Sequence, residues 1–301
     1  MCIRDRWGTP SDLEEYQYWS NIFYSIINEQ EPPEHKGSLL LPMVGLGSRF
    51  SENGYKLPKP LIEVSRKPMA LQALMDLPHT ERQKFILRSD MEGLEKLKNT
   101  LAANSKSAEF SILDHMTNGQ ATTCVEGSHG LPEDEPVTIA ACDNGMIYNS
   151  DLFESLMHSK NIDVIVWGAR GYPGAIRNPE MYGWIEANEL GIIKSVSVKK
   201  PLLNPSKDLV IAGAFTFKKM SNFLKSVEMM KDRGGLVNGE YYVDSAINDA
   251  ISMGLRCVVF EIDYYICWGT PNDLRTFEYW QTCFNNWKGH PYTLDKDRNV
   301  I

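Results

Sequence analysis

The sequence predicts an α/β fold, in which a mostly parallel β-sheet is flanked by helices. From Ser38 onward, short apolar runs alternate with longer amphipathic stretches, and such alternation is typical of strands connected by helices. The first run, Leu39–Val44, is short and uninterrupted, as expected of a strand buried on both faces. In folds of this kind the functional site lies beyond the carboxyl ends of the strands.

The predicted elements follow in chain order. We expect strands at 38–44, 84–88, 109–114, 137–142 and 163–169, and helices near 68–77, 91–103, 120–126 and 152–159. After residue 171 the runs at 183–188, 192–199 and 209–217 lack long intervening helices, which indicates a small antiparallel insert over the site. Helices near 218–231 and 241–253, a strand at 256–266 and a final helix complete the prediction.

Composition narrows the class of protein. The chain has 301 residues, of which 43% are hydrophobic and 23% charged, and its net charge is −8. These values are typical of a globular chain, and the acidic balance argues against a general nucleic-acid-binding surface. No apolar run approaches the roughly 18 residues that span a bilayer, and no secretory leader is visible. The six scattered cysteines contain no CxxC pair and favour a reducing compartment, so the expected location is the cytoplasm.

A glycine-containing turn follows the first strand. It consists of Gly45, Leu46, Gly47, Ser48 and Arg49. Glycines let backbone N–H groups approach a ligand closely, and such turns bind phosphate oxygens. The guanidinium of Arg49 suits phosphate, and Lys59 is restrained between two prolines. From Arg49 to Lys67 the local net charge is +3, which predicts an anion site. The alternative is a tight turn beside a solvated arginine.

The stretch 39–69, LLLPMVGLGSRFSENGYKLPKPLIEVSRKPM, resembles the signature of the sugar-phosphate nucleotidyltransferases. GLGSR, LPKPLIEV and KPM occur in the family's order. Within the family, the stretch is most similar to the branch found in capsule and lipopolysaccharide gene clusters. The resemblance implies a Rossmann-like (GT-A-like) fold. It also implies that the turn amides and Arg49 hold a triphosphate and that Lys59 neutralises charge near the α-phosphate. Val44 departs from the small residue common in the family.

Two later segments match the nucleotide side of the family. Asp143 follows an apolar strand and corresponds to the aspartate that holds Mg²⁺, an ion that prefers hard oxygen ligands. An Asx-turn at the strand end is the alternative for Asp143. Gly119 and Gln120 precede a helix and resemble the segment that contacts the nucleobase, although a surface helix start also explains them.

Other segments match the acceptor side. Gly183, Lys200 and Glu240 resemble residues that line the sugar-phosphate pocket, and Lys200 corresponds to the lysine that grips the sugar phosphate. A solvated acidic helix start is the alternative for Glu240. The family's glutamate before that lysine is Lys199 here, a change that alters the charge of the pocket.

The second metal ligand of the family has no obvious equivalent. Many members carry an aspartate two residues before the final Gly-Thr, where this chain has Cys267. Asp263 is close in sequence, and strand alternation puts it on the face of Cys267 only if no bulge intervenes. The second ligand therefore stays unassigned.

The two ends of the chain repeat one another. Residues 7–24 and 268–285 align without gaps, and both begin with WGTP and continue as a helix. We interpret residues 1–27 as the tail of a preceding nucleotidyltransferase-like copy, 28–37 as a linker and 38–301 as one domain. Residues 1–6 resemble translated adapter sequence and are possible artefacts. The first helix is then expected to dock weakly or stay exposed, and removal of residues 1–36 is expected to preserve the fold.

The sequence therefore predicts an Mg²⁺-dependent nucleotidyltransferase that uses a nucleoside triphosphate and a sugar phosphate, with no nucleic acid or membrane partner. A homo-oligomer or a tandem-domain partner is compatible with it. Two alternatives stay open. One is a glycosyltransferase of the same fold that uses a nucleotide sugar, and the other is a non-catalytic copy that binds a nucleotide sugar or acts as a scaffold.

Overall fold

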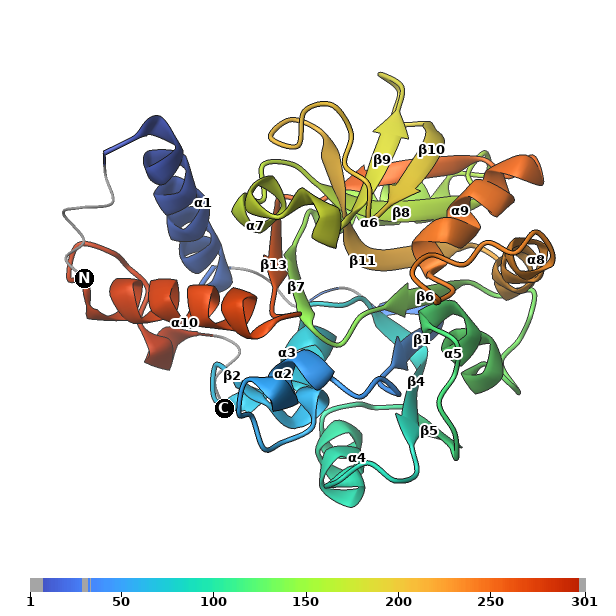
Figure 1. The fold of residues 1–301 in the computed structure, drawn as a ribbon, viewed down its shortest axis with the longest axis horizontal. Coiled ribbons are helices and arrows are strands. Elements are labelled where there is room, and N and C mark those ends of the chain that lie inside the picture. Colours follow the sequence, from blue (N-terminus) through green and yellow to red (C-terminus); the bar gives the residue numbers. More distant parts are fainter. Residues whose placement is uncertain (1–7, 29–31, 33, 298–301) are drawn as a thin grey trace.

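The computed structural model describes residues 8–28, 32 and 34–297. Within them, nine strands form the central sheet (Figure 1). They are β1 (Glu34–Pro42), β4 (His79–Arg88), β5 (Ala108–Leu113), β6 (Val137–Ala140), β8 (Val164–Ala169), β9 (Gly183–Ala187), β10 (Ile193–Val198), β11 (Leu209–Phe217) and β12 (Cys257–Glu261). The predicted α/β fold, with a mostly parallel sheet flanked by helices, is confirmed, and the sheet also contains antiparallel pairs.

The parallel part of the sheet is the half that bears on function. β1 pairs in parallel with β4 and β6, and β4 pairs in parallel with β5. β11 runs antiparallel to β6, β8 and β9, and β10 runs antiparallel to β9. β9, β10 and β11 thus pair antiparallel with one another, as predicted for these three strands, and they belong to the central sheet.

Both faces of the sheet are buried. On β1, Leu39 and Leu41 belong to one hydrophobic cluster and Leu40 belongs to the other, as the uninterrupted apolar run predicts. The Leu40 face is covered by α5 (Gln120–Gly127), α8 (Met220–Asp232) and α9 (Val243–Ser252). The opposite face carries α1 (Pro10–Ile26), α3 (Met69–Met75), α4 (Leu94–Ala103), α6 (Ser150–His158), α7 (Pro173–Arg177) and α10 (Pro271–Asn286).

Short elements complete the fold. They are α2 (Ser48–Glu52), the 3₁₀ turns η2 (Lys59–Leu61), η3 (Pro179–Met181) and η4 (Leu294–Lys296), and two ribbons, β2 (Glu63–Val64) with β3 (Lys67–Pro68) and β7 (Asn144–Ile147) with β13 (Tyr264–Cys267). None of the described helices is long and apolar enough to cross a bilayer.

The single strand predicted at 256–266 is wrong. It is two strands in different sheets, because β12 pairs with β8 and β13 pairs with β7. The chain turns at Ile262, whose N–H donates to Gly168 O at 2.9 Å, and at Asp263, whose N–H donates to Ile147 O at 2.9 Å. Each N–H donates its hydrogen bond to a strand of a different sheet, so the chain passes from one sheet to the other at these two residues.

The expectation that the first helix docks weakly or stays exposed is also wrong. Trp19, Ile22 and Phe23 on α1 are at most 1% exposed and belong to the main hydrophobic cluster. Figure 1 shows α1 standing against α10 at one end of the molecule. Sheet pairing begins at Glu34, inside the predicted linker. Residues 1–7 lie outside the described residues, and the origin of α1 in a preceding copy stays a prediction.

Candidate active site

The loops after β1 and β6 meet at one edge of the sheet, because parallel strands end on the same side. Together they enclose a cavity of about 200 Å³. Its lining contains five of the predicted site residues: Gly45, Gly47, Lys59, Gln120 and Asp143. The structure therefore brings together residues that are up to 98 positions apart in the sequence.

Gly47 is required by the shape of this loop. Its φ is +64°, a left-handed conformation that favours glycine. A Cβ at Gly47 would also lie 2.9 Å from the Cβ of Lys59. Lys59 opens η2, which the Leu61 N–H closes by donating to Pro58 O at 2.8 Å. The glycine and the proline-held lysine thus fit against each other. Val44, which precedes the turn, is buried in the core and 3% exposed.

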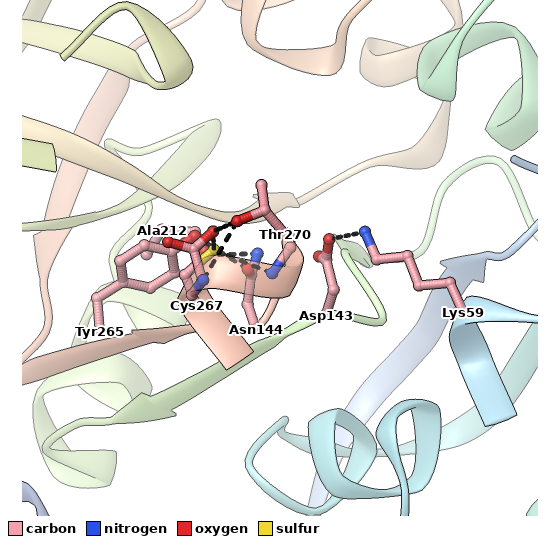
Figure 2. A network of polar contacts seen from close by, with 9 residues as sticks. Lys59, Asp143, Asn144, Ala212, Tyr265, Cys267 and Thr270 are labelled. Atoms are coloured by element: carbon pink, nitrogen blue, oxygen red, sulfur yellow. Dashed lines mark hydrogen bonds and ion pairs between the residues drawn. The ribbon is translucent and has the colours of Figure 1, made fainter. Parts of the chain in front are cut away.

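Lys59 and Asp143 form an ion pair inside the cavity, and Figure 2 shows their side chains pointing toward each other. About one fifth of each side chain is exposed, 20% and 18% respectively. Burial lowers the pKa of Lys59, but the adjacent Asp143 carboxylate outweighs it and the pKa is raised overall. Lys59 is therefore a cation, held beside a carboxylate that a ligand can still reach.

The ribbon of β7 and β13 fixes the backbone at Asp143. Asn144 pairs with Cys267 across the ribbon, and the Trp268 N–H donates to Asp143 O at 2.8 Å. A Cβ at Gly269 would lie 3.1 Å from Asp143 Oδ2. The final WGT motif therefore packs directly against the candidate carboxylate.

Cys267 itself is a buried, neutral thiol. Burial raises its pKa, its Sγ accepts the Gly269 N–H at 3.3 Å, and it lies 3.8 Å from Asp273 Oδ2. Asp273 also accepts the Thr270 hydroxyl at 2.7 Å, at the start of α10. Asp263 is exposed and adjoins the opposite end of β13, where β7 ends. Asp263 therefore cannot act as the second ligand of a metal ion bound by Asp143. Among the described residues no group of three or more His, Cys, Asp or Glu is arranged to hold a metal.

Arg49 lies in a different cavity from Lys59. This cavity, of about 300 Å³, is lined by Arg49, Met181, Tyr182, Asp273 and their neighbours. Leu46 and Ser48 are exposed residues of the turn and line neither cavity. The turn 45–49 thus contributes to both cavities.

The remaining predicted residues lie around α5 and α9. Gly119 caps α5 and lies against the segment before α9, since the Tyr241 N–H donates to Asn118 O at 2.8 Å. Glu240 and Lys200 are exposed. Gly183 is buried under Asp244, and a Cβ there would lie 2.4 Å from Asp244 Oδ2. Gly119 and Glu240 therefore approach each other, whereas the Lys200 side chain points to solvent.

A larger cavity, of about 740 Å³, lies away from the strand ends between α1 and α10. It is lined mainly by aromatic side chains, among them Tyr16, Trp280 and Trp287. Among the described residues its lining contains no basic group and no glycine turn of the kind that binds phosphate. The smaller cavity is therefore the candidate site for an anionic ligand.

No protein-family model matches this chain, and no curated protein matches it. Solved structures do. The nucleoside-diphosphate-sugar pyrophosphorylase from Vibrio cholerae RC9 aligns with a TM-score of 0.65 and 18% identity, over 79% of this chain and 98% of its own. A putative glucose-1-phosphate thymidylyltransferase from Bacillus anthracis aligns with a TM-score of 0.61 and 16% identity, over 81% and 94%. The inositol-1-phosphate CTP transferase from T. maritima aligns with a TM-score of 0.63 and 13% identity, over 81% of this chain and 95% of its own.

The chain has the nucleotidyltransferase fold. At these identities the likeness establishes the fold, and the residue roles rest on the geometry of the two cavities. Two residues of this nucleotidyltransferase fold were not predicted as site residues. They are Asp244, whose Oδ2 lies against Gly183, and Lys199, which has Asp244 and Arg49 as charged neighbours. For Lys199 the sequence did contain a signal, because lysine replaces the family's glutamate at this position.

Proposed function

We propose that the protein catalyses nucleotidyl transfer from a nucleoside triphosphate to a sugar phosphate or similar phosphorylated alcohol, giving a nucleotide sugar and pyrophosphate. The proposal is carried by the cavity at the strand ends, where a glycine turn, Lys59 and Asp143 converge. A glycine turn and a cation suit a polyphosphate, and a fold shared with sugar-phosphate nucleotidyltransferases supports the same chemistry.

In this proposal the backbone N–H groups of residues 45–48 and the Arg49 guanidinium hold the triphosphate. An oxygen of the acceptor phosphate attacks the α-phosphorus, the bond from that phosphorus to the bridging oxygen breaks, and pyrophosphate leaves with the electron pair. Lys59 stabilises negative charge that builds up near the α-phosphate. No covalent enzyme intermediate is required, because positioning and charge neutralisation supply the catalysis. Gly119 and Gln120 contact the nucleobase.

The donor set fits Mg²⁺. Asp143 offers one partly exposed carboxylate in the cavity, and Mg²⁺ is commonly bound by one or two carboxylates together with substrate phosphates and water. Asp143 would hold the ion, which when bound neutralises phosphate charge. The Lys59 ammonium, now paired with Asp143, would then pair with the nucleotide.

The acceptor side is formed by the region around Gly183 and Glu240, which the sequence resemblance suggests for the sugar phosphate. The resemblance to the capsule and lipopolysaccharide branch supports a role in surface polysaccharide synthesis. The described cysteines are free thiols, which supports a reducing compartment and hence the cytoplasm.

The test is incubation of the protein with each of the four nucleoside triphosphates, Mg²⁺ and a panel of sugar 1-phosphates, with pyrophosphate release as the readout. One productive pair is expected, and activity should be lost in the Asp143→Asn variant. If no pair releases pyrophosphate while a nucleotide sugar is consumed with an acceptor, the glycosyltransferase alternative replaces this proposal. Binding of a nucleotide sugar without turnover would support the non-catalytic alternative.

A further inference from the structure

Lys199 and Lys200 follow β10 side by side, but their side chains have different surroundings. Lys200 is exposed, and its carbonyl accepts the Ser197 hydroxyl at 2.6 Å. Lys199 is half-buried, its N–H donates to Tyr182 O at 3.0 Å, and its ammonium donates to Met181 O. Lys199 is thus held on the η3 segment that lines the cavity of Arg49.

The backbone at Lys199 is strained in a way that orients the side chain. Its φ is +56°, a left-handed conformation that non-glycine residues adopt only when their surroundings impose it. An extended residue at this position would direct its side chain elsewhere, because successive residues of a strand point to opposite faces. The strained backbone therefore holds the ammonium at the carbonyl of Met181, a residue that lines the cavity of Arg49.

The groups around Lys199 are those of an acceptor pocket. Its Nζ lies 5.9 Å from the centre of the Tyr242 ring. Asp244 and Glu240 act on it as opposite charges and Arg49 as a like charge, while Asp244 Oδ2 lies against the backbone of Gly183. Two cations and two carboxylates thus face one region, an arrangement that can bind a phosphate and hydroxyl groups together.

The ammonium also has unused hydrogen-bonding capacity. A lysine offers three donors, and among the described residues its one hydrogen-bond acceptor is the Met181 carbonyl. Burial lowers the pKa of Lys199, opposed by Asp244. A half-buried cation with few acceptors gains most from a ligand that brings anionic oxygens.

We propose that Lys199, and not Lys200, binds the phosphate group of the acceptor, and that Asp244 and Glu240 accept hydrogen bonds from its hydroxyl groups. The acceptor class is a phosphate monoester of a polyhydroxy compound. This inference rests on the proposed function, and it replaces the role that sequence resemblance gives to Lys200.

The first test is kinetic and uses the productive substrate pair. Lys199→Met is expected to raise the KM for the sugar phosphate at least tenfold and to leave nucleotide binding, measured by calorimetry, unchanged. Lys199→Arg should restore most of the loss, and the neighbouring control Lys200→Met should behave as the unaltered protein does. A larger effect at Lys200 than at Lys199 would overturn the inference.

The second test does not depend on turnover. The intact protein is acetylated with an N-hydroxysuccinimide ester, and mass spectrometry measures the modification of Lys199 and Lys200 with glucose 1-phosphate, with inorganic phosphate and with glucose. Either phosphate probe should protect Lys199 several-fold, glucose should not, and Lys200 should serve as the internal control. Protection of Lys199 without pyrophosphate release would retain the anion site and reject the proposed function. Pyrophosphate release without protection of Lys199 by either phosphate probe would reject the inference alone.

Discussion

The hydroxyl of Tyr18 ties α1 to the strand that leads into the candidate site. It donates to Tyr265 O at 2.8 Å and accepts the Tyr265 N–H at 3.0 Å. Tyr265 lies on β13, whose other edge pairs with β7 beside Asp143. The Tyr18 hydroxyl thus makes both of the backbone hydrogen bonds that a neighbouring strand would make with Tyr265. The informative perturbation is Tyr18→Phe, which removes the hydroxyl and keeps the ring.

The expected loss follows from the two backbone groups left behind. Tyr265 is 3% exposed, so water cannot easily replace the lost partner. An unsatisfied buried polar group costs about 1–3 kcal/mol, so two such groups should remove roughly 2–6 kcal/mol from the free energy of unfolding. Since about 1 kcal/mol shifts the Tm of a chain of this size by about 2 °C, the Tm should fall by about 4–12 °C.

The same helix supplies the control. Tyr24 also lies on α1 and is 56% exposed, so Tyr24→Phe should change stability by less than about 0.5 kcal/mol. Thermal melting followed by circular dichroism compares the two variants. Equal shifts, or an unchanged Tm for Tyr18→Phe, would refute the argument that α1 supports β13.

Three further predictions address the site and the pH dependence of stability. Arg49→Ala should weaken nucleoside triphosphate binding and turnover together by about tenfold or more, because charge-assisted contacts are each worth roughly 1.5–3 kcal/mol; calorimetry that finds unchanged affinity would speak against this site. Asp143→Asn should abolish activity at limiting Mg²⁺ with the Tm little changed, and retained activity would assign the metal to another acid. Burial lowers the pKa of His35 below its ordinary 6.5, so the unfolded chain binds more protons and stability should fall as the pH drops through about 6.5. Urea unfolding at pH 7.5 and 5.5 should show a smaller difference for His35→Phe than for the unaltered chain, and an identical difference would exclude His35 as the cause.

The sequence was sufficient to predict that two of the candidate residues lie at strand ends. Gly47 comes three residues after the predicted strand 38–44, and Asp143 directly follows the predicted strand 137–142. Parallel pairing then brings strand ends to one edge of the sheet. Local pattern and topology agree at these positions.

Other features depend on contacts that the pattern does not encode. The turn at Ile262 and Asp263 divides one apolar run between two sheets. The point of division depends on where Gly168 and Ile147 offer their carbonyls. The choice between Lys199 and Lys200 is a one-residue difference, and one residue is enough to exchange the faces of a strand. The left-handed φ of Lys199 is a tertiary effect and has no signature in the sequence.

The two copies of the WGTP helix show how one amphipathic pattern serves two sets of partners. Leu274 on α10 is fully buried, whereas the equivalent Leu13 on α1 is 43% exposed. α1 instead packs its other end onto its own duplicate, with Phe23 5.4 Å from the ring of Phe277. The sequence defines an apolar stripe on each helix, but the available partner decides which part of the stripe is buried.

This difference also decides whether α1 is dispensable. α1 buries Trp19, Ile22, Phe23 and Ile26, and each such side chain contributes about 1.5–3 kcal/mol. Their sum, of order 10 kcal/mol, is as large as the whole stability of a typical domain, about 5–15 kcal/mol. The helix that sequence similarity marks as the tail of another copy is therefore part of the core of this domain, and its removal should unfold the chain.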